Sequence, residues 1–340
     1  MKNAGKIWLI ILITQFSVTS QTQNIGSEQD LLSYKGDYFG QKPPGNTPEI
    51  FLPEVFNQFG YLHGKLTFSP DGKEACWVIT TSDKGVDIDK RFFIKQNNDG
   101  TWNKPVQSFL NIERRENGPS YSADGQRLYY QSRATLTGNG ENKDIDIWFR
   151  ERKGDGWSEP INIGTPVNTS KDESQPWIAN DGSIFFCREN EKSGRTDLGG
   201  SDIYYSQFSN GKYSEPVCLG KEVNSEYHET ELCVSPDGSY LLFISNRPGG
   251  YSRMMNLYIC FKTPPSGWKE AICLSHELKI DNIWFPTITY DGKYLFFCGG
   301  YPEPNGGGYS QSNYYWVSTG LIDEMNPFKN NFKTQIEKDN

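Results

Sequence analysis

The sequence predicts an all-β fold, a β-propeller of four-stranded blades, on three observations. The 340 residues include 20 Phe, 19 Tyr, 9 Trp and 34 Gly, a composition that favours strands joined by tight turns. One turn motif recurs at nearly even spacing, and two further short strands follow it in most repeats. Tandem sets of four short strands are typical of propeller blades. The segments between them lack helical periods of useful length, which argues against a doubly wound α/β fold.

The N-terminal residues 1–20 have the features of a secretory signal peptide. Lys2 and Lys6 precede a short apolar run, residues 7–13, and Val18–Ser20 provides a cleavage site. The run is too short to span a bilayer, although an uncleaved anchor is the alternative. We therefore expect an exported protein, periplasmic or secreted, that is not an integral membrane protein. Residues 21–47 form a leader in this scheme.

The charge of the chain argues against a nucleic-acid partner. Removing Lys2 and Lys6 takes the net charge from -8 to -10. An acidic protein gains nothing from the phosphate backbone that dominates nucleic-acid affinity. The expected partner is a protein or glycan of the cell envelope.

The repeated turn fixes the unit length. Its Asp residues are 53, 57, 56 and 54 positions apart. Pro or a similar residue presets a type I turn, Asp favours the next position, and Gly adopts the left-handed conformation that closes the hairpin. An apolar, aromatic strand follows each turn. The five copies are Ser69–Gly72, Ser122–Gly125, Ala179–Gly182, Ser235–Gly238 and Thr289–Gly292.

Two more strands complete most units. The third strand is predicted at 146–148, 202–204, 256–258 and 313–315. The outer strand is predicted at the segments that begin with Gly and an aromatic residue, which are Gly100–Trp102 with Pro105, Gly156–Trp157 with Pro160, Gly211–Tyr213 with Pro216, and Gly267–Trp268.

The ends of the chain determine the blade count. The fifth unit has a third strand at Tyr314–Val317 but lacks the outer strand, and the N-terminal segment Pro48–Pro53 is placed to supply it. This gives five blades within one domain, residues 48–325, followed by a tail, residues 326–340, with a short helix possible only after Ile322. Six blades are the alternative if residues 21–60 contribute more than one strand. Closure removes exposed sheet edges, so a monomer is expected.

These motifs resemble the WD40-like (PD40) repeats of the TolB-like propeller family. The likeness rests on the Ser-Pro-Asp-Gly hairpin, the Asp-Ile-Tyr strand and the Gly-Trp-x-x-Pro strand, and it covers roughly residues 51–320. The leader Tyr38–Gly45 is similar to that of exported single-propeller members. The resemblance implies a propeller. It leaves function open, because this fold carries binding modules and enzymes alike.

A ring of polar residues is the candidate ligand site. Counting eight residues back from each turn Asp gives three glutamates in register, and two histidines lie at or beside the same position. Such residues at a channel mouth suit a divalent cation, or a cationic or sugar ligand. The structural alternative is that each Glu accepts backbone N–H groups of an adjacent blade. The ring comprises His63, Glu116, Glu173, His228 and Glu229.

Arginines recur just after the second strand of three units, at Arg133, Arg188 and Arg247. Carboxylates or an amide open the following strand, at Asp146, Asp202 and Asn256, so structural pairing across the loop is expected. A phosphate or carboxylate ligand is the functional alternative. The seven cysteines lie in apolar runs without C-x-x-C spacing, so we expect buried free thiols.

The sequence favours a non-catalytic binding module. It holds neither a Gly-x-Ser-x-Gly elbow nor a phosphate-binding Gly-rich loop. The alternative is a carbohydrate-active enzyme that uses Glu116, Glu173 and Glu229, because glycoside hydrolysis needs only two carboxylates. No cofactor is expected, apart from a possible divalent cation in the channel.

Overall fold

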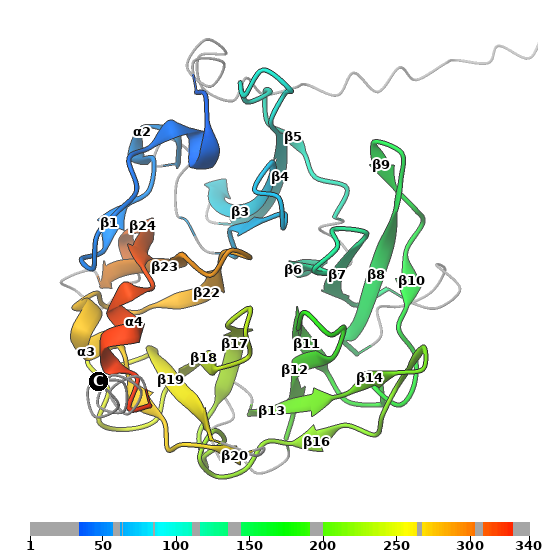
Figure 1. Cartoon of the computed structure of the whole chain (residues 1–340), viewed down its shortest axis with the longest axis vertical. Helices are drawn as coiled ribbons and strands as arrows, with labels where there is room; N and C mark the ends of the chain where they lie inside the picture. The colour runs from blue at the N-terminus through cyan, green and yellow to red at the C-terminus, as the bar shows by residue number, and fades with distance from the viewer. Residues whose placement is uncertain are drawn as a thin grey trace, which may run out of the picture.

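Five main antiparallel sheets surround a common axis in the computed structural model (Figure 1). The predicted propeller is confirmed, and the ring has five blades, not six. The predicted signal peptide and His63 lie outside the described residues. The structure describes residues 34–56, 62, 64–83, 86–110, 116–134, 144–190, 200–263, 267–302 and 309–328.

Each blade is listed from its inner strand outward. Blade 1 contains β2 (Thr67–Phe68), β3 (Glu74–Asp83), β4 (Val86–Lys95) and β5 (Val106–Gln107). Blade 2 contains β6 (Asn117–Tyr121), β7 (Arg127–Ser132), β8 (Asp146–Lys153), β9 (Gly156–Trp157) and β10 (Ile161–Asn162). Blade 3 contains β11 (Glu173–Ile178), β12 (Ile184–Glu189), β13 (Ser201–Ser206) and β16 (Val217–Cys218), with a ribbon of β14 (Phe208–Ser209) and β15 (Lys212–Tyr213).

The last two blades follow the same order. Blade 4 contains β17 (Glu229–Val234), β18 (Tyr240–Ser245), β19 (Asn256–Thr263), β20 (Gly267–Trp268) and β21 (Ile272–Cys273). Blade 5 contains β22 (Trp284–Ile288), β23 (Tyr294–Pro302), β24 (Tyr309–Ser318) and β1 (Glu49–Ile50).

An N-terminal strand closes the ring. β1 pairs antiparallel with β24, with Glu49 opposite Trp316 and Ile50 opposite Tyr315. This confirms that the N-terminal segment supplies the missing outer strand of the last blade. Phe51, fully buried just after β1, packs against Phe296 and Trp316 and anchors the closure in the core.

The turn chemistry explains why the hairpins recur. In blade 1 the Ser69 hydroxyl donates to Asp71 Oδ1 at 2.6 Å, and the same oxygen accepts the Lys73 N–H at 3.1 Å. Gly72 has φ of 70°, a left-handed conformation that glycine adopts without strain. In blade 2 the equivalent hydrogen bond from Ser122 holds the pKa of Asp124 below its usual value. The turns are therefore self-stabilised by a hydroxyl and a carboxylate two residues apart.

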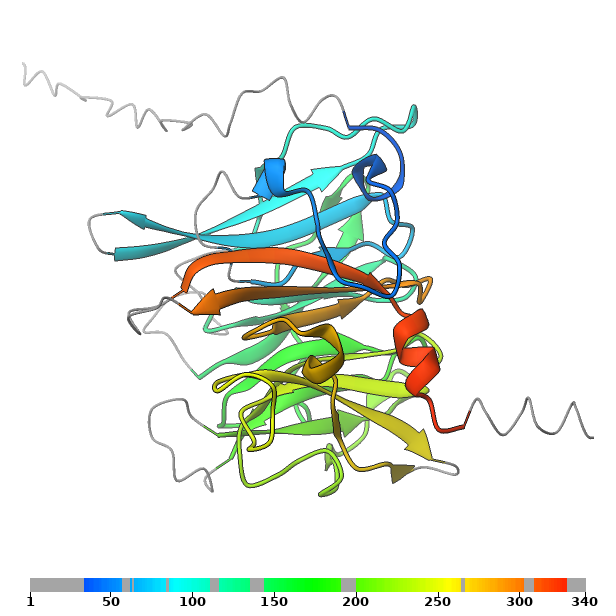
Figure 2. The same ribbon diagram turned by 90° about the vertical axis from the view of Figure 1, so that its left-hand side faces the viewer.

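Helices are few and short. They are the 3₁₀ helix η1 (Asp37–Gly40), α2 (Pro53–Phe56), α3 (Ser275–Leu278) and α4 (Gly320–Met325). A short helix was expected only after Ile322, but α4 begins at Gly320, and η1, α2 and α3 lie earlier in the chain. Figure 2 shows η1 and α4 on the same side of the ring. Over the described ranges, every helix is too short to cross a membrane.

Candidate functional site

Two of the predicted glutamates are engaged by groups of their own blade or of the loop leading into it. The carboxylate of Glu173 accepts from the Thr169 N–H at 2.9 Å, the Thr169 hydroxyl at 2.6 Å and Arg188 Nε at 2.8 Å. Its side chain is fully buried. Burial raises the pKa of Glu173 above its ordinary value, although Thr169 and Arg188 counteract the rise.

Glu229 repeats this arrangement one blade on. Its carboxylate accepts from the Ser225 N–H and hydroxyl, from the Ser245 hydroxyl and from Arg247 Nη2, at 2.7–2.9 Å. A Thr or Ser four residues before the Glu, with an Arg after the second strand, therefore forms a structural unit. The donors reach the carboxylates from the entry loop and from strand ends, not from an adjacent blade as expected.

The other ring members have separate surroundings. Glu116 is buried, with 1% of its surface exposed. The Nδ1 of His228 lies 3.2 Å from the Ser201 hydroxyl, which also donates to the Glu229 carbonyl, and burial lowers the pKa of His228. His228 is thus linked to the backbone of Glu229 through Ser201, whereas His63 lies outside the described residues.

The recurring arginines pair with carboxylates, but among the described residues not with Asp146, Asp202 or the Asn256 amide across the loop, as the sequence predicted. Arg188 binds Glu173 at 2.8 Å and Arg247 binds Glu229 at 2.9 Å, each within one blade. Arg133 instead reaches Asp172 at the entrance to blade 3, at 3.4 Å. The guanidinium groups of Arg188 and Arg247 also lie over aromatic rings of β13 and β19. These contacts tie the inner strand of a blade to its second and third strands.

All seven cysteines are free thiols, as expected, but Cys218 is exposed on β16 and Cys273 is partly exposed. The other five are buried. Among the described residues, no group of three or more His, Cys, Asp or Glu side chains is arranged to hold a metal ion.

A second set of inner-strand residues was missed from the sequence. It lies six, not eight, positions before the turn Asp, where the pairing of four inner strands shifts register. Gln175, Glu231 and Phe285 have positive φ there, and Glu231 Oε2 accepts the Phe285 N–H at 2.7 Å. Blade 1 places Lys65 at the same position, with its ammonium 4.9 Å from the Trp177 ring centroid. The set spans the ring from blade 1 to blades 3, 4 and 5.

Two charged groups of this set are deeply buried. Burial lowers the pKa of Lys65 to about 8 and raises the pKa of Glu231 to about 8. Each group partly offsets the shift of the other by attraction. A count six residues back from each turn Asp, instead of eight, would have found both.

The spaces between neighbouring blades differ more than the blades do. We call the space between two blades, on the face that carries the Asp-Gly turns, an interblade groove. One residue of each blade, at the same repeat position, faces a groove. In four blades the backbone N–H of this residue donates to the carbonyl of the residue two positions after the turn Asp. These residues are Gln96, Arg152, Lys262 and Thr319, and Phe208 takes the same place in blade 3.

The groove between blades 1 and 2 is closed by an ion pair. Arg152 donates two hydrogen bonds to the Glu74 carboxylate, at 2.9 and 2.8 Å. The Arg152 guanidinium also lies 4.0 Å from the ring centroid of Trp157. Tyr121 donates to Glu74 from the blade 2 side, at 3.3 Å. The Glu74 carboxylate, the Arg152 guanidinium and the Trp157 indole therefore have their partners within the chain.

The leader closes the groove between blades 5 and 1. Phe39 stacks on Trp102 with ring centroids 4.1 Å apart. The Gly36 carbonyl accepts from Gln96 Nε2 at 2.7 Å and from the Trp102 indole at 2.8 Å. Trp102 is fully buried as a result.

Two other grooves are occupied in further ways. Between blades 2 and 3, Phe208 packs on Tyr213, whose hydroxyl donates to the Gly182 carbonyl at 3.3 Å. Between blades 4 and 5, α4 buries Ile322 in the core, and the Lys269 ammonium lies 4.7 Å from the Phe328 ring centroid.

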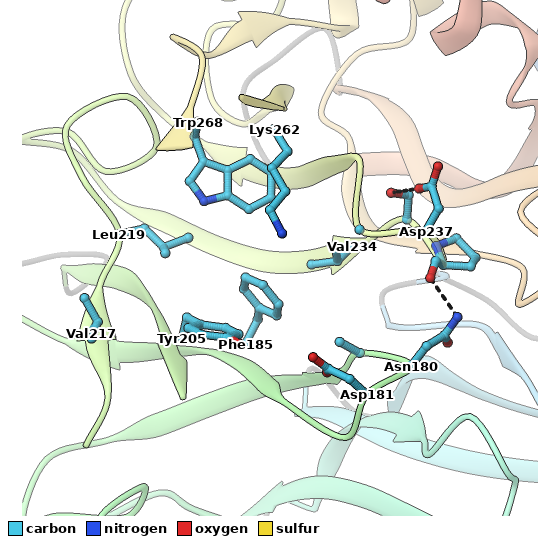
Figure 3. Close-up of a pocket in the computed structure, with 14 residues that line it drawn as sticks. Asn180, Asp181, Phe185, Tyr205, Val217, Leu219, Val234, Asp237, Lys262 and Trp268 are labelled. Carbon is cyan, nitrogen blue, oxygen red and sulfur yellow. Dashed lines mark hydrogen bonds between the residues drawn. The ribbon is translucent and has the colours of Figure 1, made fainter. Parts of the chain in front are cut away.

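The groove between blades 3 and 4 holds a pocket of about 540 Å³ (Figure 3). Three aromatic side chains line it, with the rings of Phe185 and Tyr205 4.8 Å apart and Trp268 edge-on to Phe185 at 6.5 Å. Figure 3 shows the Lys262 ammonium pointing into the pocket between Trp268 and Phe185. The turn residues Asn180, Asp181, Pro236 and Asp237 form its other wall.

A shortened turn accompanies this pocket. In blade 4, Val234 and Leu241 pair, three before and four after the turn Asp. In blade 3, Ile178 pairs with Ile184, three before and three after Asp181, so the hairpin has one residue fewer. Ala179 also replaces the Ser or Thr whose hydroxyl binds the turn Asp in the other blades. Sequence reasoning treated the five turns as copies and missed this departure.

Comparisons with known proteins give the fold and no more. No protein-family model and no curated protein sequence matches the chain. TolB from Acinetobacter baumannii is similar in structure, with a TM-score of 0.43 and 12% identity over 75% of this chain and 56% of TolB. The catalytic domain of the GH62 α-L-arabinofuranosidase from Coprinopsis cinerea gives 0.46 and 9% over 84% of this chain and 96% of that domain.

An α-L-arabinanase from Penicillium chrysogenum gives a TM-score of 0.43 and 13% identity over 76% of each chain. The chain spans about half the length of TolB. At these identities the likeness concerns the propeller fold alone.

Proposed function

We propose that the protein is an exported, non-catalytic binding module that holds its ligand in the groove between blades 3 and 4. The observation that carries this is the contrast among grooves. Side chains, the leader or a helix occupy four of them, whereas the fifth keeps a pocket lined by three aromatic rings and a lysine. Concave, mostly apolar sites with a few polar groups are typical ligand sites.

The surroundings of the ring glutamates support binding over catalysis. The carboxylates of Glu173 and Glu229 accept three and four hydrogen bonds respectively, each including one from an arginine. A general acid or base needs a proton that it can exchange with substrate. Export through residues 1–20 and kinship with TolB-like propellers are part of the same proposal.

The experiment is ligand profiling of the purified protein on glycan arrays and against envelope peptides. We expect Trp268→Ala to abolish binding of any ligand found. Tyr251→Ala is the matched control, because Tyr251 is an aromatic residue of blade 4 that is 43% exposed and is not among the pocket residues. Binding that survives Trp268→Ala would place the ligand elsewhere.

A carbohydrate-active enzyme is the second candidate, favoured by Glu231. A buried carboxyl group with its pKa raised to about 8 can stay protonated at neutral pH, as a general acid requires. Reducing-sugar release from polysaccharides tests this. Release that disappears in Glu231→Gln or Glu173→Gln would replace the binding proposal.

A further inference from the structure

The groove between blades 3 and 4 lacks the anion that its equivalent contains. Lys262 occupies the repeat position of Arg152, since the backbone N–H of each donates to the carbonyl two residues after the turn Asp. Arg152 meets the Glu74 carboxylate across its groove. Among the described residues, the Lys262 ammonium has no hydrogen bond and no carboxylate within 4 Å.

The residue of blade 3 that corresponds to Glu74 can be identified from the backbone hydrogen bonds. The Glu74 carbonyl accepts the Ser69 N–H, and the Ser183 carbonyl accepts the Ala179 N–H in the same way. Ser183 therefore stands where Glu74 would be, in a hairpin one residue shorter. Its hydroxyl accepts from Tyr205 and from the Phe208 N–H within blade 3. The described residues therefore offer Lys262 no carboxylate at this place.

The rest of the pocket suits a ring with hydroxyl groups. Phe185, Tyr205 and Trp268 supply aromatic surface, on which sugars and other flat groups stack. Among the described residues, Asp181 accepts a hydrogen bond only from the Ser183 N–H, because Ala179 has no hydroxyl to donate. This exposed carboxylate keeps lone pairs for O–H donors.

We propose that the groove between blades 3 and 4 binds an acidic sugar of the uronate class. The sugar carboxylate pairs with Lys262, the ring lies against Trp268 and Phe185, and a hydroxyl donates to Asp181. This inference rests on the proposed binding function and names its ligand class. A uronate carries a carboxylate for the Lys262 ammonium and hydroxyl groups for the Asp181 carboxylate on one ring.

Calorimetric titration with oligogalacturonate tests the proposal on the intact protein. The comparison ligands are the same oligomer with methyl-esterified carboxylates and a Glu-rich peptide. We expect esterification and Lys262→Met each to weaken binding at least about tenfold, Lys262→Arg to retain it, and added salt to weaken it. Asp181→Asn should weaken binding less than Lys262→Met.

The outcomes separate this inference from the function on which it rests. If neutral and acidic oligomers bind equally and only Trp268→Ala matters, the acidic-sugar assignment fails and the binding function stands. Preference for the peptide, lost in Lys262→Met, also overturns the sugar assignment. If none of these probes binds, the acidic-sugar assignment fails. Binding of another ligand that ignores Trp268→Ala rejects the proposed site as well.

Discussion

The groove between blades 1 and 2 and the groove between blades 3 and 4 come from the same repeat but differ in completeness. In the first, Glu74, Arg152 and Trp157 satisfy one another. In the second, Lys262 and Trp268 have the places of Arg152 and Trp157, and Ser183 stands where Glu74 stands in blade 1. In a repeat protein, a charged or aromatic side chain can have its partner within the chain in one unit and lack it in another. The unit without the partner is where a ligand can bind.

Breaking the closed groove should have the largest effect on stability. Glu74→Gln leaves Arg152 partly buried without its carboxylate, so we expect a loss of about 4 kcal/mol in the free energy of unfolding. Urea denaturation measures it. Glu151→Gln is the control, because its pair with Arg127 is nearly half exposed and should contribute less than about 1 kcal/mol. Equal losses in the two variants would contradict the expectation that the buried Glu74–Arg152 pair contributes more than the exposed Glu151–Arg127 pair.

Removing the leader's aromatic anchor should cost slightly less. Phe39→Ala takes a buried ring from the stack with Trp102, and large-to-small core changes of this kind cost about 3 kcal/mol. Trp268 has the repeat position of Trp102 in blade 4. Trp268→Ala should cost less than about 1 kcal/mol, because its ring lines an open pocket. Thermal unfolding of the two variants compares them. A leader that is only loosely attached would give the opposite ranking.

A pH series tests whether stability also depends on the protonation of the buried Glu231 carboxyl group. The pKa of Glu231 is raised to about 8 in the folded protein, so the folded state holds a proton that the unfolded chain releases near its ordinary value of 4.5. Stability gained from this proton is complete below pH 4.5 and is lost as pH rises toward 8. Glu231→Gln keeps an oxygen to accept the Phe285 N–H but has no proton to lose.

We therefore expect the wild type to lose stability relative to Glu231→Gln between pH 5 and pH 8, by up to about 1.4 kcal/mol per pH unit. Parallel urea curves at pH 5, 6.5 and 8 give the difference. A constant difference across this range would mean that Glu231 is ionised throughout.

The smallest effect is expected in the open groove. Lys262→Met should change the free energy of unfolding by less than about 0.5 kcal/mol, because its ammonium is exposed and has no partner within the described chain. Arg152→Met should destabilise much more, since it strands the buried Glu74. If both substitutions destabilise alike, Lys262 has a structural role and the two grooves are equivalent.

The fold was predictable because it depends on local chemistry that repeats. The Asp-Gly turn, with its hydroxyl and glycine, is a property of four consecutive residues, so spacing alone indicated five units. The closing strand followed from the outer strand that blade 5 lacks.

The candidate site was less predictable, because it depends on departures from the repeat. Counting eight residues back found Glu173 and Glu229, whose partners Thr169 and Ser225 were visible in the sequence but not recognised. The register shift at which Glu231 has a positive φ comes from backbone pairing, which residue spacing does not show. Blade 3 has Ser183 at the repeat position of Glu74, and this equivalence follows from the register of β11 and β12, which residue spacing does not show.

The pairing of β1 with β24 also has a consequence for how the chain is made. Glu49 and Trp316 are 267 positions apart (316 minus 49), so β1 has no partner strand until β24 has been synthesised. Contacts of such sequence separation form late, because a long loop must close before they contribute. A chain released before β24 would leave Phe51 without Trp316, against which it packs. The ring can therefore close only after β24 has been made.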